Sequence, residues 1–166
     1  MKLPVPDIRL DRITQLSPDL LAERGIRLVM LDLDNTIAPY GTQEPEADIL
    51  AWTESVREAG TELFFVSNSK RAGRVERFAE ILGVGFVKAA RKPRPDALHR
   101  VMAEHGYEPG RCALAGDQIF TDVWAARRAG CLAVVVRPIR FTNPFLYLRY
   151  LAEKPFRALR RKHGEN

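Results

Sequence analysis

Short apolar segments alternate along the chain with longer segments in which apolar residues recur at helical spacing. The short segments are rich in Val, Ile and Leu and are almost uniformly apolar, which is typical of parallel strands buried on both faces. They comprise residues 26–33, 63–66, 85–87, 112–115 and 132–136. We therefore expect five strands of a mostly parallel sheet.

Four predicted helices separate these strands or follow them, and each is closed by a glycine. Their apolar faces consist of Ile49, Trp52, Val56 and Ala59, then Val75, Phe78, Ala79 and Leu82, then Leu98, Val101, Met102 and His105, and finally Ile119, Val123 and Ala126. The residues that close them are Gly60, Gly83, Gly106 and Gly130, at positions that suit a left-handed backbone. A shorter helix is expected earlier, with Ser17 as N-cap, Pro18 in its first turn and Gly25 beyond its end.

The alternation predicts an α/β fold: a three-layer, Rossmann-like open parallel sheet with helices on both faces. The chain has 166 residues, an ordinary length for one domain. We expect that domain to span residues 1–140 and to be followed by a tail, residues 141–166. Between Asp34 and Ser67, and again between Ser67 and Lys92, there is room for one helix and one strand only. The crevice at the strand ends should therefore lack a cap domain.

Positive charge is concentrated in the tail. The net charge is +5, yet eight Lys or Arg and only two Glu follow Val136. Apolar residues at near-helical spacing lie among these basic residues, namely Phe145, Leu148, Leu151, Ala152, Phe156 and Leu159. Asn143 and Pro144 resemble a cap and first turn, and Pro155 is expected to interrupt or kink the helix. Such a basic amphipathic tail either lies in the interface of an anionic membrane, or packs its first part on the domain and leaves its end solvated.

Polar residues that could take part in catalysis or metal binding follow four of the predicted strands. Asp32 and Asp34 follow the first, Ser67 and Asn68 the second, Lys92 the third, and Asp117 the fourth, with Asp122 five residues later. The carboxyl ends of parallel strands form the ligand-binding edge of such sheets. We therefore expect these side chains to converge in one crevice.

The convergence has a chemical reading. Three clustered carboxylates, Asp32, Asp34 and Asp117, repel one another unless a cation offsets them, and an all-oxygen ligand set suits Mg²⁺. Asp32 and Asp34 point to the same side of an extended strand, so one can attack phosphorus while the other handles protons. Ser67 and Lys92 can bind phosphoryl oxygens, and the lysine neutralises charge in the transition state.

These residues resemble the four motifs of the haloacid dehalogenase superfamily: Asp-x-Asp-x-Thr at residues 32–36, a Ser, a Lys, and an acidic pair, all in order. The segments 31–36, 91–93, 116–118 and 121–123 are similar to the YqeG group of subfamily IIIA. That group is related to the phosphatidylglycerophosphate phosphatases of mitochondria and plastids. The resemblance covers roughly residues 7–157 and implies a haloacid dehalogenase-like fold; Ser69 departs from it, where the family often has Asn.

The resemblance implies a role for each matching residue. Asp32 is the nucleophile that becomes an aspartyl phosphate, and Asp34 protonates the leaving alkoxide and then deprotonates the water. Mg²⁺ is held by Asp32, by the backbone carbonyl of Asp34 and by Asp117. Asp122 supports the site without binding the metal itself. The phosphate-binding residues are Ser67, Lys92, Asn68 and Thr36; alternatively, Asn68 only shapes its turn and Thr36 only holds the loop.

The expected function is Mg²⁺-dependent dephosphorylation of phosphatidylglycerophosphate to phosphatidylglycerol. An uncapped site suits a substrate presented by a surface, such as a lipid headgroup, and the tail suits an anionic membrane. One alternative keeps the chemistry on a soluble sugar, nucleotide or amino-alcohol phosphate. Another is a non-catalytic module that binds RNA or protein through the tail, although nucleic acid is disfavoured by the few aromatic residues.

The expected location is the cytoplasm, with peripheral attachment to the inner face of the membrane as an option. The longest apolar run has six residues, whereas a membrane span needs about twenty. Residues 1–10 carry Asp7 and Arg9 and do not resemble a signal peptide. Cys112 and Cys131 are expected to be buried free thiols in a reducing compartment.

Overall fold

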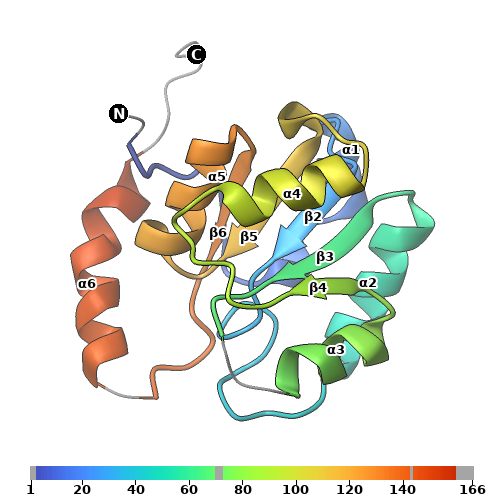
Figure 1. Ribbon diagram of the computed structural model, residues 1–166. Coiled ribbons are helices and arrows are strands. Elements are labelled where there is room, and N and C mark those ends of the chain that lie inside the picture. The colour runs from blue at the N-terminus through green and yellow to red at the C-terminus, as the bar shows by residue number, and fades with distance from the viewer. Residues whose placement is uncertain (1–2, 70–72, 143, 160–166) are drawn as a thin grey trace.

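Six parallel strands form one sheet in the order β1-β6-β5-β2-β3-β4. The architecture comes from a computed structural model that describes residues 3–69, 73–142 and 144–159. The strands are β1 (Ile8–Leu10), β2 (Leu28–Leu31), β3 (Glu62–Val66), β4 (Gly85–Val87), β5 (Cys112–Gly116) and β6 (Leu132–Val136). Helices cover both faces of this sheet (Figure 1), so the predicted three-layer α/β fold is confirmed.

Two apolar cores lie on opposite faces of the sheet. Helices α1 (Pro18–Glu23), α2 (Ala47–Glu58) and α3 (Arg74–Leu82) contribute to one core, and α4 (Asp96–Glu104) and α5 (Trp124–Ala129) to the other. Strand β2 shows why its sequence is uniformly apolar: Val29 and Leu31 belong to the first core, Leu28 and Met30 to the second. Successive side chains of a strand alternate between faces, so a central strand needs apolar residues throughout.

The predicted helix ends are confirmed. The hydroxyl of Ser17 accepts a hydrogen bond from the Leu20 amide at 3.2 Å and caps α1, which begins with Pro18. The glycines expected after the helices all have positive φ, between 63° and 84°: Gly25, Gly60, Gly83, Gly106 and Gly130. A left-handed residue at that position costs a glycine little, and it lets the chain turn back toward the next strand.

Strand β1 and a stretch of π-helix were not predicted. β1 has only three residues with Arg9 in the middle, and its pairing is determined by the longer strand β6 beside it. Asp7 fixes the start of this edge strand, because its carboxylate accepts a hydrogen bond from the Ala133 amide at 2.8 Å. Residues Ile119–Val123, expected as ordinary α-helix, instead form a π-helical turn that leads into α5.

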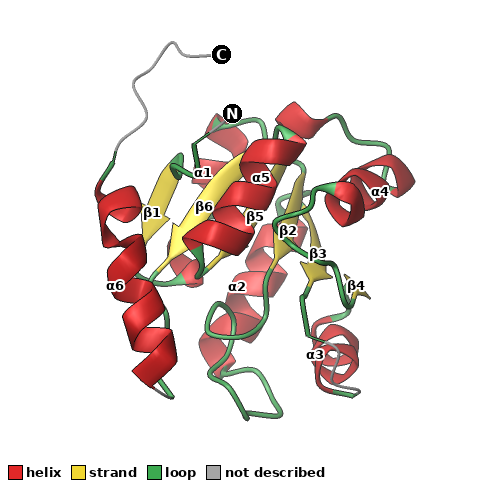
Figure 2. Cartoon of the chain, turned by 60° about the vertical axis from the view of Figure 1, so that its left-hand side comes forward, coloured by secondary structure: helices red, strands yellow, loops and turns green. Residues whose placement is uncertain are grey.

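The tail forms helix α6 (Pro144–Ala158), which lies at the side of the molecule next to the β1 edge (Figures 1 and 2). Of the two effects expected at Pro155, a kink or an interruption, the interruption is wrong, because the helix continues to Ala158. Its final turn is held in place by other residues: Phe156 packs against the second core, and Arg9 donates to the carbonyls of Ala158 and Leu159. The predicted cap Asn143 and the basic residues Arg160, Arg161 and Lys162 lie outside the described residues.

In the described part of the chain, no helix is long and apolar enough to cross a membrane.

The order of the strands reverses between β2 and β5. The chain places β3 and β4 on one side of β2, and β5 and β6 on the other. A crevice forms at the carboxyl ends of the strands where such a reversal occurs, and ligands bind there.

Only α2 and β3 separate Asp34 from Ser67, and only α3 and β4 separate Ser67 from Lys92. Since residues 70–72 are too few for a domain, the prediction of an uncapped fold is confirmed.

Candidate active site

Asp32 directly extends β2 at the reversal point. Its amide donates to the carbonyl of Ala115 in β5 at 2.9 Å, which continues the pairing of the two strands by one residue. The backbone then turns at Asn35, whose φ is 62° and whose amide donates to the Ala38 carbonyl at 2.8 Å. This turn lets both Asp32 and Asp34 line one cleft. Asp32 is nearly buried, and the side chain of Asp34 is 21% exposed.

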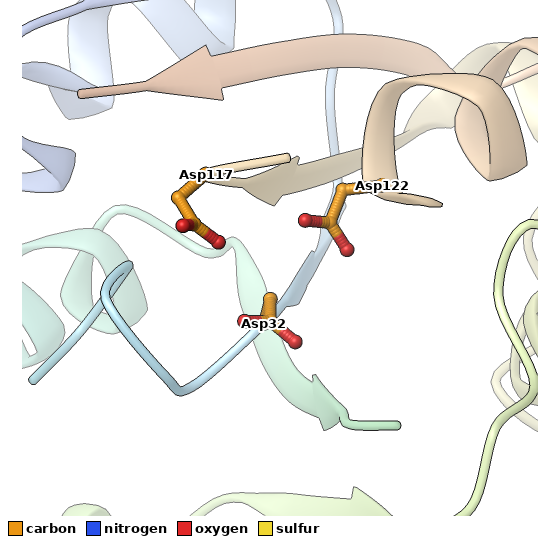
Figure 3. A group of neighbouring side chains, drawn as sticks. All are labelled: Asp32, Asp117 and Asp122. Atoms are coloured by element: carbon orange, nitrogen blue, oxygen red, sulfur yellow. The ribbon is translucent and has the colours of Figure 1, made fainter. Parts of the chain in front are cut away.

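Three carboxylates meet at the strand ends. Asp32, Asp117 and Asp122 come from the ends of β2 and β5 and from the π-helical turn, and Figure 3 shows their side chains pointing toward one another. One oxygen atom of each lies within 4.8 Å of the others. Burial raises the pKa of Asp32 to about 7, with Asp122 adding to the rise and Lys92 opposing it. Burial, with help from Asp122 and Asp32, also raises the pKa of Asp117.

A divalent cation suits this cluster on structural grounds. The Oδ1 atom of Asp117 is buried and has no hydrogen-bond partner among the residues that the structure describes. Such an unsatisfied carboxylate oxygen is costly in the absence of a ligand. The available donors are all oxygen atoms, the type that hard cations such as Mg²⁺ prefer. Asp32 and Asp117 are therefore well placed to hold a metal.

Lys92 is buried against two of these carboxylates. Its Nζ lies 2.8 Å from Oδ1 of Asp32 and 2.7 Å from Oδ1 of Asp122. Burial alone would lower the pKa of this amine, but Asp122 and Asp32 more than offset that and raise it above its ordinary value. Asp122 is held on its other side, where Oδ2 accepts a hydrogen bond from the Gln118 amide at 3.1 Å. The lysine is thus charged and fixed beside the predicted nucleophile.

Asn68 supports the main chain of Lys92. Its amide nitrogen donates to the Lys92 carbonyl at 3.0 Å, and its amide oxygen accepts from the Lys92 amide at 2.8 Å. The surrounding turn is unusual: Lys92-Pro93 is a cis peptide, and Ala89 and Arg91 have φ of 50° and 59°. These contacts correspond to the turn-shaping alternative for Asn68, and phosphate binding by its side chain stays a prediction.

Ser67 and Thr36 occupy different environments. Ser67 lines the cleft, and its hydroxyl accepts a hydrogen bond from the Ser69 amide at 3.1 Å. Thr36 belongs to the loop after β2 and is buried, and within the described residues its hydroxyl has no hydrogen-bond partner. Its burial corresponds to the alternative that it holds the loop. The structure thus brings every predicted residue except Thr36 either into the cleft wall or beside Asp32.

The cleft in front of Asp32 and Asp34 is large, with a volume of about 1090 Å³. The loop after β2, the end of β3, the start of α3, and Thr142 and Leu146 near the start of α6 line it. Tyr40 from the loop stands in this wall, and burial, followed by the charges of the nearby aspartates, raises its pKa to about 12. A phenol with that pKa stays neutral and can donate a hydrogen bond.

Arg74 is a site residue that sequence patterns did not identify. It is the first residue of α3, and its guanidinium forms an ion pair with Asp34. It also donates to the carbonyls of Pro39 and Thr42, at 2.8 and 2.7 Å. Forty residues separate Arg74 from Asp34, and no motif connects them. One indication in the sequence places Arg74 near the crevice: its position near the start of the helix that follows the second motif.

Helix α6 reaches the site through another unpredicted residue, Arg157. Its guanidinium donates to the carbonyl of Asp117 and, at 3.1 Å, to that of Val136 at the end of β6. Glu153, which is 1% exposed, lies 3.2 Å from the same guanidinium. The positive charges of Arg149 and Arg157 oppose the rise in the pKa of Asp117. The tail therefore contacts the main chain of a predicted metal ligand.

Comparisons with known proteins agree with this arrangement. A family model described as haloacid dehalogenase-like hydrolase matches residues 14–130. A Bacillus subtilis (strain 168) protein named "Probable phosphatase YqeG" is 31% identical over 163 residues, which cover 97% of this chain and 94% of that protein.

Solved structures share the fold at lower identity. The 3-deoxy-D-manno-octulosonate 8-phosphate phosphatase of Yersinia pestis is 18% identical, with a TM-score of 0.57 over 78% of this chain and 72% of its own. The corresponding enzyme of Moraxella catarrhalis, in complex with a magnesium ion, a phosphate ion and a KDO molecule, is 19% identical, with a TM-score of 0.51 over 61% and 64%. At these identities the likeness concerns the fold.

The carboxylate cluster predicts a pH-dependent effect of metal on stability. The pKa of Asp32 is raised from 3.8 to about 7 in the folded protein, so folding favours the protonated form. Without metal, this group should therefore lose its stabilising contribution as the pH rises from 3.8 through about 7. A cation binds the deprotonated ligands. Thermal unfolding should show a larger Tm gain from Mg²⁺ over EDTA at about pH 8 than at about pH 5.

The Asp117→Asn variant is the control, because it removes a carboxylate from the cluster and should reduce the Mg²⁺-dependent Tm gain at both pH values. An equal gain at the two pH values in the unmodified protein would contradict the cluster as the metal site.

Gly116 provides a second test. A Cβ atom at this position would lie 2.2 Å from the carboxyl carbon of Asp122. Gly116→Ala should therefore displace Asp122 and weaken its hold on Lys92, lowering turnover and costing about 1–3 kcal/mol of unfolding free energy. Urea unfolding and phosphatase assays measure the two effects. Gly110→Ala, where the added Cβ meets nothing within 4 Å, is the matched control; equal behaviour of the two variants would refute the packing argument.

Proposed function

The chain belongs to the haloacid dehalogenase-like hydrolases and is a phosphatase of that family, and we propose that it is a Mg²⁺-dependent phosphomonoesterase that works through an aspartyl phosphate on Asp32. The observation that carries this proposal is the position of Asp32. Its carboxylate contacts a buried lysine, lies within the acidic cluster, and lines an open cleft together with Asp34.

In the first step, a carboxylate oxygen of Asp32 attacks phosphorus and the bond to the leaving oxygen breaks. Asp34 gives its proton to that oxygen, so the product leaves as an alcohol. In the second step, Asp34 takes a proton from the water that attacks phosphorus, and inorganic phosphate leaves while the Asp32 carboxylate is restored. Mg²⁺, held by Asp32, Asp117 and the carbonyl of Asp34, would supply charge neutralisation for the phosphoryl oxygens.

Lys92 and Ser67 assist the transferred group. The ammonium of Lys92 lies 2.8 Å from the attacking carboxylate, so it lies close to the phosphoryl oxygens when the new bond forms. Its positive charge offsets the negative charge spread over them. Ser67 lines the same cleft and offers its hydroxyl as a donor. Asp122 is a positioning residue, because it holds Lys92 from the other side.

The proposed substrate is phosphatidylglycerophosphate, presented by an anionic membrane. The cleft opens without a covering domain, and Leu146 in its wall belongs to α6. On that helix, Phe145 and Leu148 are 70% and 65% exposed. Two basic residues are exposed as well: Lys154 on α6, and Arg140 shortly before the helix begins. Apolar side chains flanked by positive charge favour contact with anionic lipid.

The chemistry is tested by phosphate release. Wild-type protein should release phosphate from phosphatidylglycerophosphate in mixed micelles with Mg²⁺ and not with EDTA. Asp32→Asn removes the nucleophile and should lower the rate by at least about 1,000-fold. Denaturing the enzyme during turnover and detecting an acid-stable, hydroxylamine-sensitive phosphoryl group on the wild type would identify the aspartyl phosphate.

A panel of sugar, nucleotide and amino-alcohol phosphates is assayed in parallel. Release from a soluble ester alone would keep the mechanism and replace the lipid as substrate. Full activity of Asp32→Asn would rule out the proposed nucleophile. No Mg²⁺-dependent release from any compound would contradict the enzymatic proposal and reopen the alternative of a module that binds RNA or protein.

Contact with membrane is tested separately. Phe145→Ser combined with Leu148→Ser removes two exposed apolar side chains, each worth about 1.5–3 kcal/mol when buried in lipid. Binding to vesicles that contain phosphatidylglycerol should fall by at least about 10-fold in flotation experiments, and turnover of a soluble ester should persist. Leu50→Ser, at a leucine of α2 that is 41% exposed, is the control. If the wild-type protein does not bind these vesicles, the proposal that the protein contacts an anionic membrane is wrong.

A further inference from the structure

Arg74 is held at the wall of the cleft by groups on the loop after β2. One guanidinium nitrogen, Nη1, contacts Asp34, while Nη2 and Nε donate to the carbonyls of Pro39 and Thr42. The guanidinium also lies over the ring of Phe78, 5.2 Å from its centre. The side chain is only 14% exposed. It is therefore a preorganised positive charge rather than a mobile surface arginine.

The guanidinium retains hydrogen-bonding capacity. It has five N–H donors, and the contacts to described residues account for one on each of its three nitrogens. Nη1 and Nη2 thus each keep one donor. Arg74 lines the same cleft as Asp32, Asp34 and Ser67. Two neighbouring N–H groups of this kind form the fork that binds phosphate or carboxylate oxygens in a bidentate manner.

The position of Arg74 relates it to the leaving group. In the proposed mechanism Asp34 exchanges a proton with the leaving oxygen, so the leaving alcohol must lie against Asp34. Because Arg74 contacts Asp34 directly, groups a few atoms beyond that oxygen come within reach of the guanidinium. If the leaving alcohol is neutral, the remaining N–H groups of Arg74 bind only water. If the alcohol carries an anionic group, that group can accept hydrogen bonds from them.

We propose that Arg74 is a specificity-determining residue that binds a second anionic group, carried by the leaving alcohol close to the ester that is cleaved. The inference rests on the proposed function and specifies its substrate class: phosphomonoesters whose alcohol is itself an anion. The phosphodiester of phosphatidylglycerophosphate is one such group, and a carboxylate is another. Arg74 remains bound to the loop carbonyls and shares its guanidinium between Asp34 and the second anion.

Three soluble substrates that share a glycerol-like skeleton test this inference without a membrane. Glycerol 3-phosphate has no second anion, glycerophosphoglycerol phosphate has a phosphodiester, and 3-phosphoglycerate has a carboxylate. Steady-state kcat and KM are measured for the wild type and for Arg74→Gln, Arg74→Lys and Arg77→Gln. The quantity compared is the ratio of kcat/KM for an anionic substrate to that for glycerol 3-phosphate. Any common effect on Asp34 cancels in this ratio.

The wild type should prefer at least one of the two anionic substrates. Arg74→Gln should lower that preference by roughly 10- to 150-fold, mainly through KM, the loss expected for a hydrogen bond to a charged group. Arg74→Lys keeps the charge without the fork and should retain part of the preference. The substrate that loses its advantage in Arg74→Gln identifies the second anion as phosphodiester or carboxylate.

Arg77 is the matched control, since it also extends from α3 to the same loop, where it donates to the Gln43 carbonyl at 3.1 Å and pairs with Glu44. It does not line the cleft, so Arg77→Gln should keep the wild-type ratio. An unchanged ratio in Arg74→Gln, with all three substrates slowed equally, would overturn the inference and leave Arg74 as a structural support of Asp34. Absence of phosphate release by the wild type from these substrates and from the lipid would instead contradict the proposed function itself.

Discussion

The arrangement of this protein depends on the burial of three carboxylates at the strand ends. Asp32, Asp117 and Asp122 lie together at the reversal point of the sheet, where burial reduces the screening of their repulsion by solvent. The buried ammonium of Lys92 offsets part of that charge. Negative charge that Lys92 does not offset remains in the cluster. Burial, together with the repulsion between these carboxylates, therefore raises the pKa of both Asp32 and Asp117. Excess negative charge of this kind favours the binding of a divalent cation.

The sheet and the motifs at its strand ends could be predicted from the sequence because they follow local rules. The apolar segment 26–33 predicted a buried strand, and the structure forms the central strand β2 within it, with Asp32 directly following. Strand β1 escaped prediction because an edge strand of three residues takes its pairing from β6 and not from its own pattern. The continuation of α6 through Pro155 escaped for a related reason: contacts of Phe156 and Arg157 with the domain override the local preference of proline.

The limits of prediction are clearest among the arginines. Asp32, Ser67, Lys92 and Asp117 were found because each follows a strand. Arg74 follows no strand: it contacts the site because α3 begins beside the loop after β2. A sequence with 26 Lys and Arg residues offers many candidates for such a contact, and helix periodicity does not rank them. Only the three-dimensional structure identifies which cation pairs with Asp34.

Helix α6 links the outer surface of the protein to the candidate metal site. A boundary at residue 140, predicted from the change in charge, separates α6 from the phosphatase domain, yet Arg157 crosses it to reach the carbonyls of Asp117 and Val136. The carboxylate of Glu153 neutralises the charge of that guanidinium in a nearly buried ion pair. Removing one partner of such a pair strongly destabilises a protein, because the other charge is left buried and unpaired. Phe145 and Leu148 of α6 are exposed, whereas Leu146 lines the cleft and Arg157 contacts the main chain of Asp117. The tail is therefore better understood as a wall of the active site than as an appendage to it.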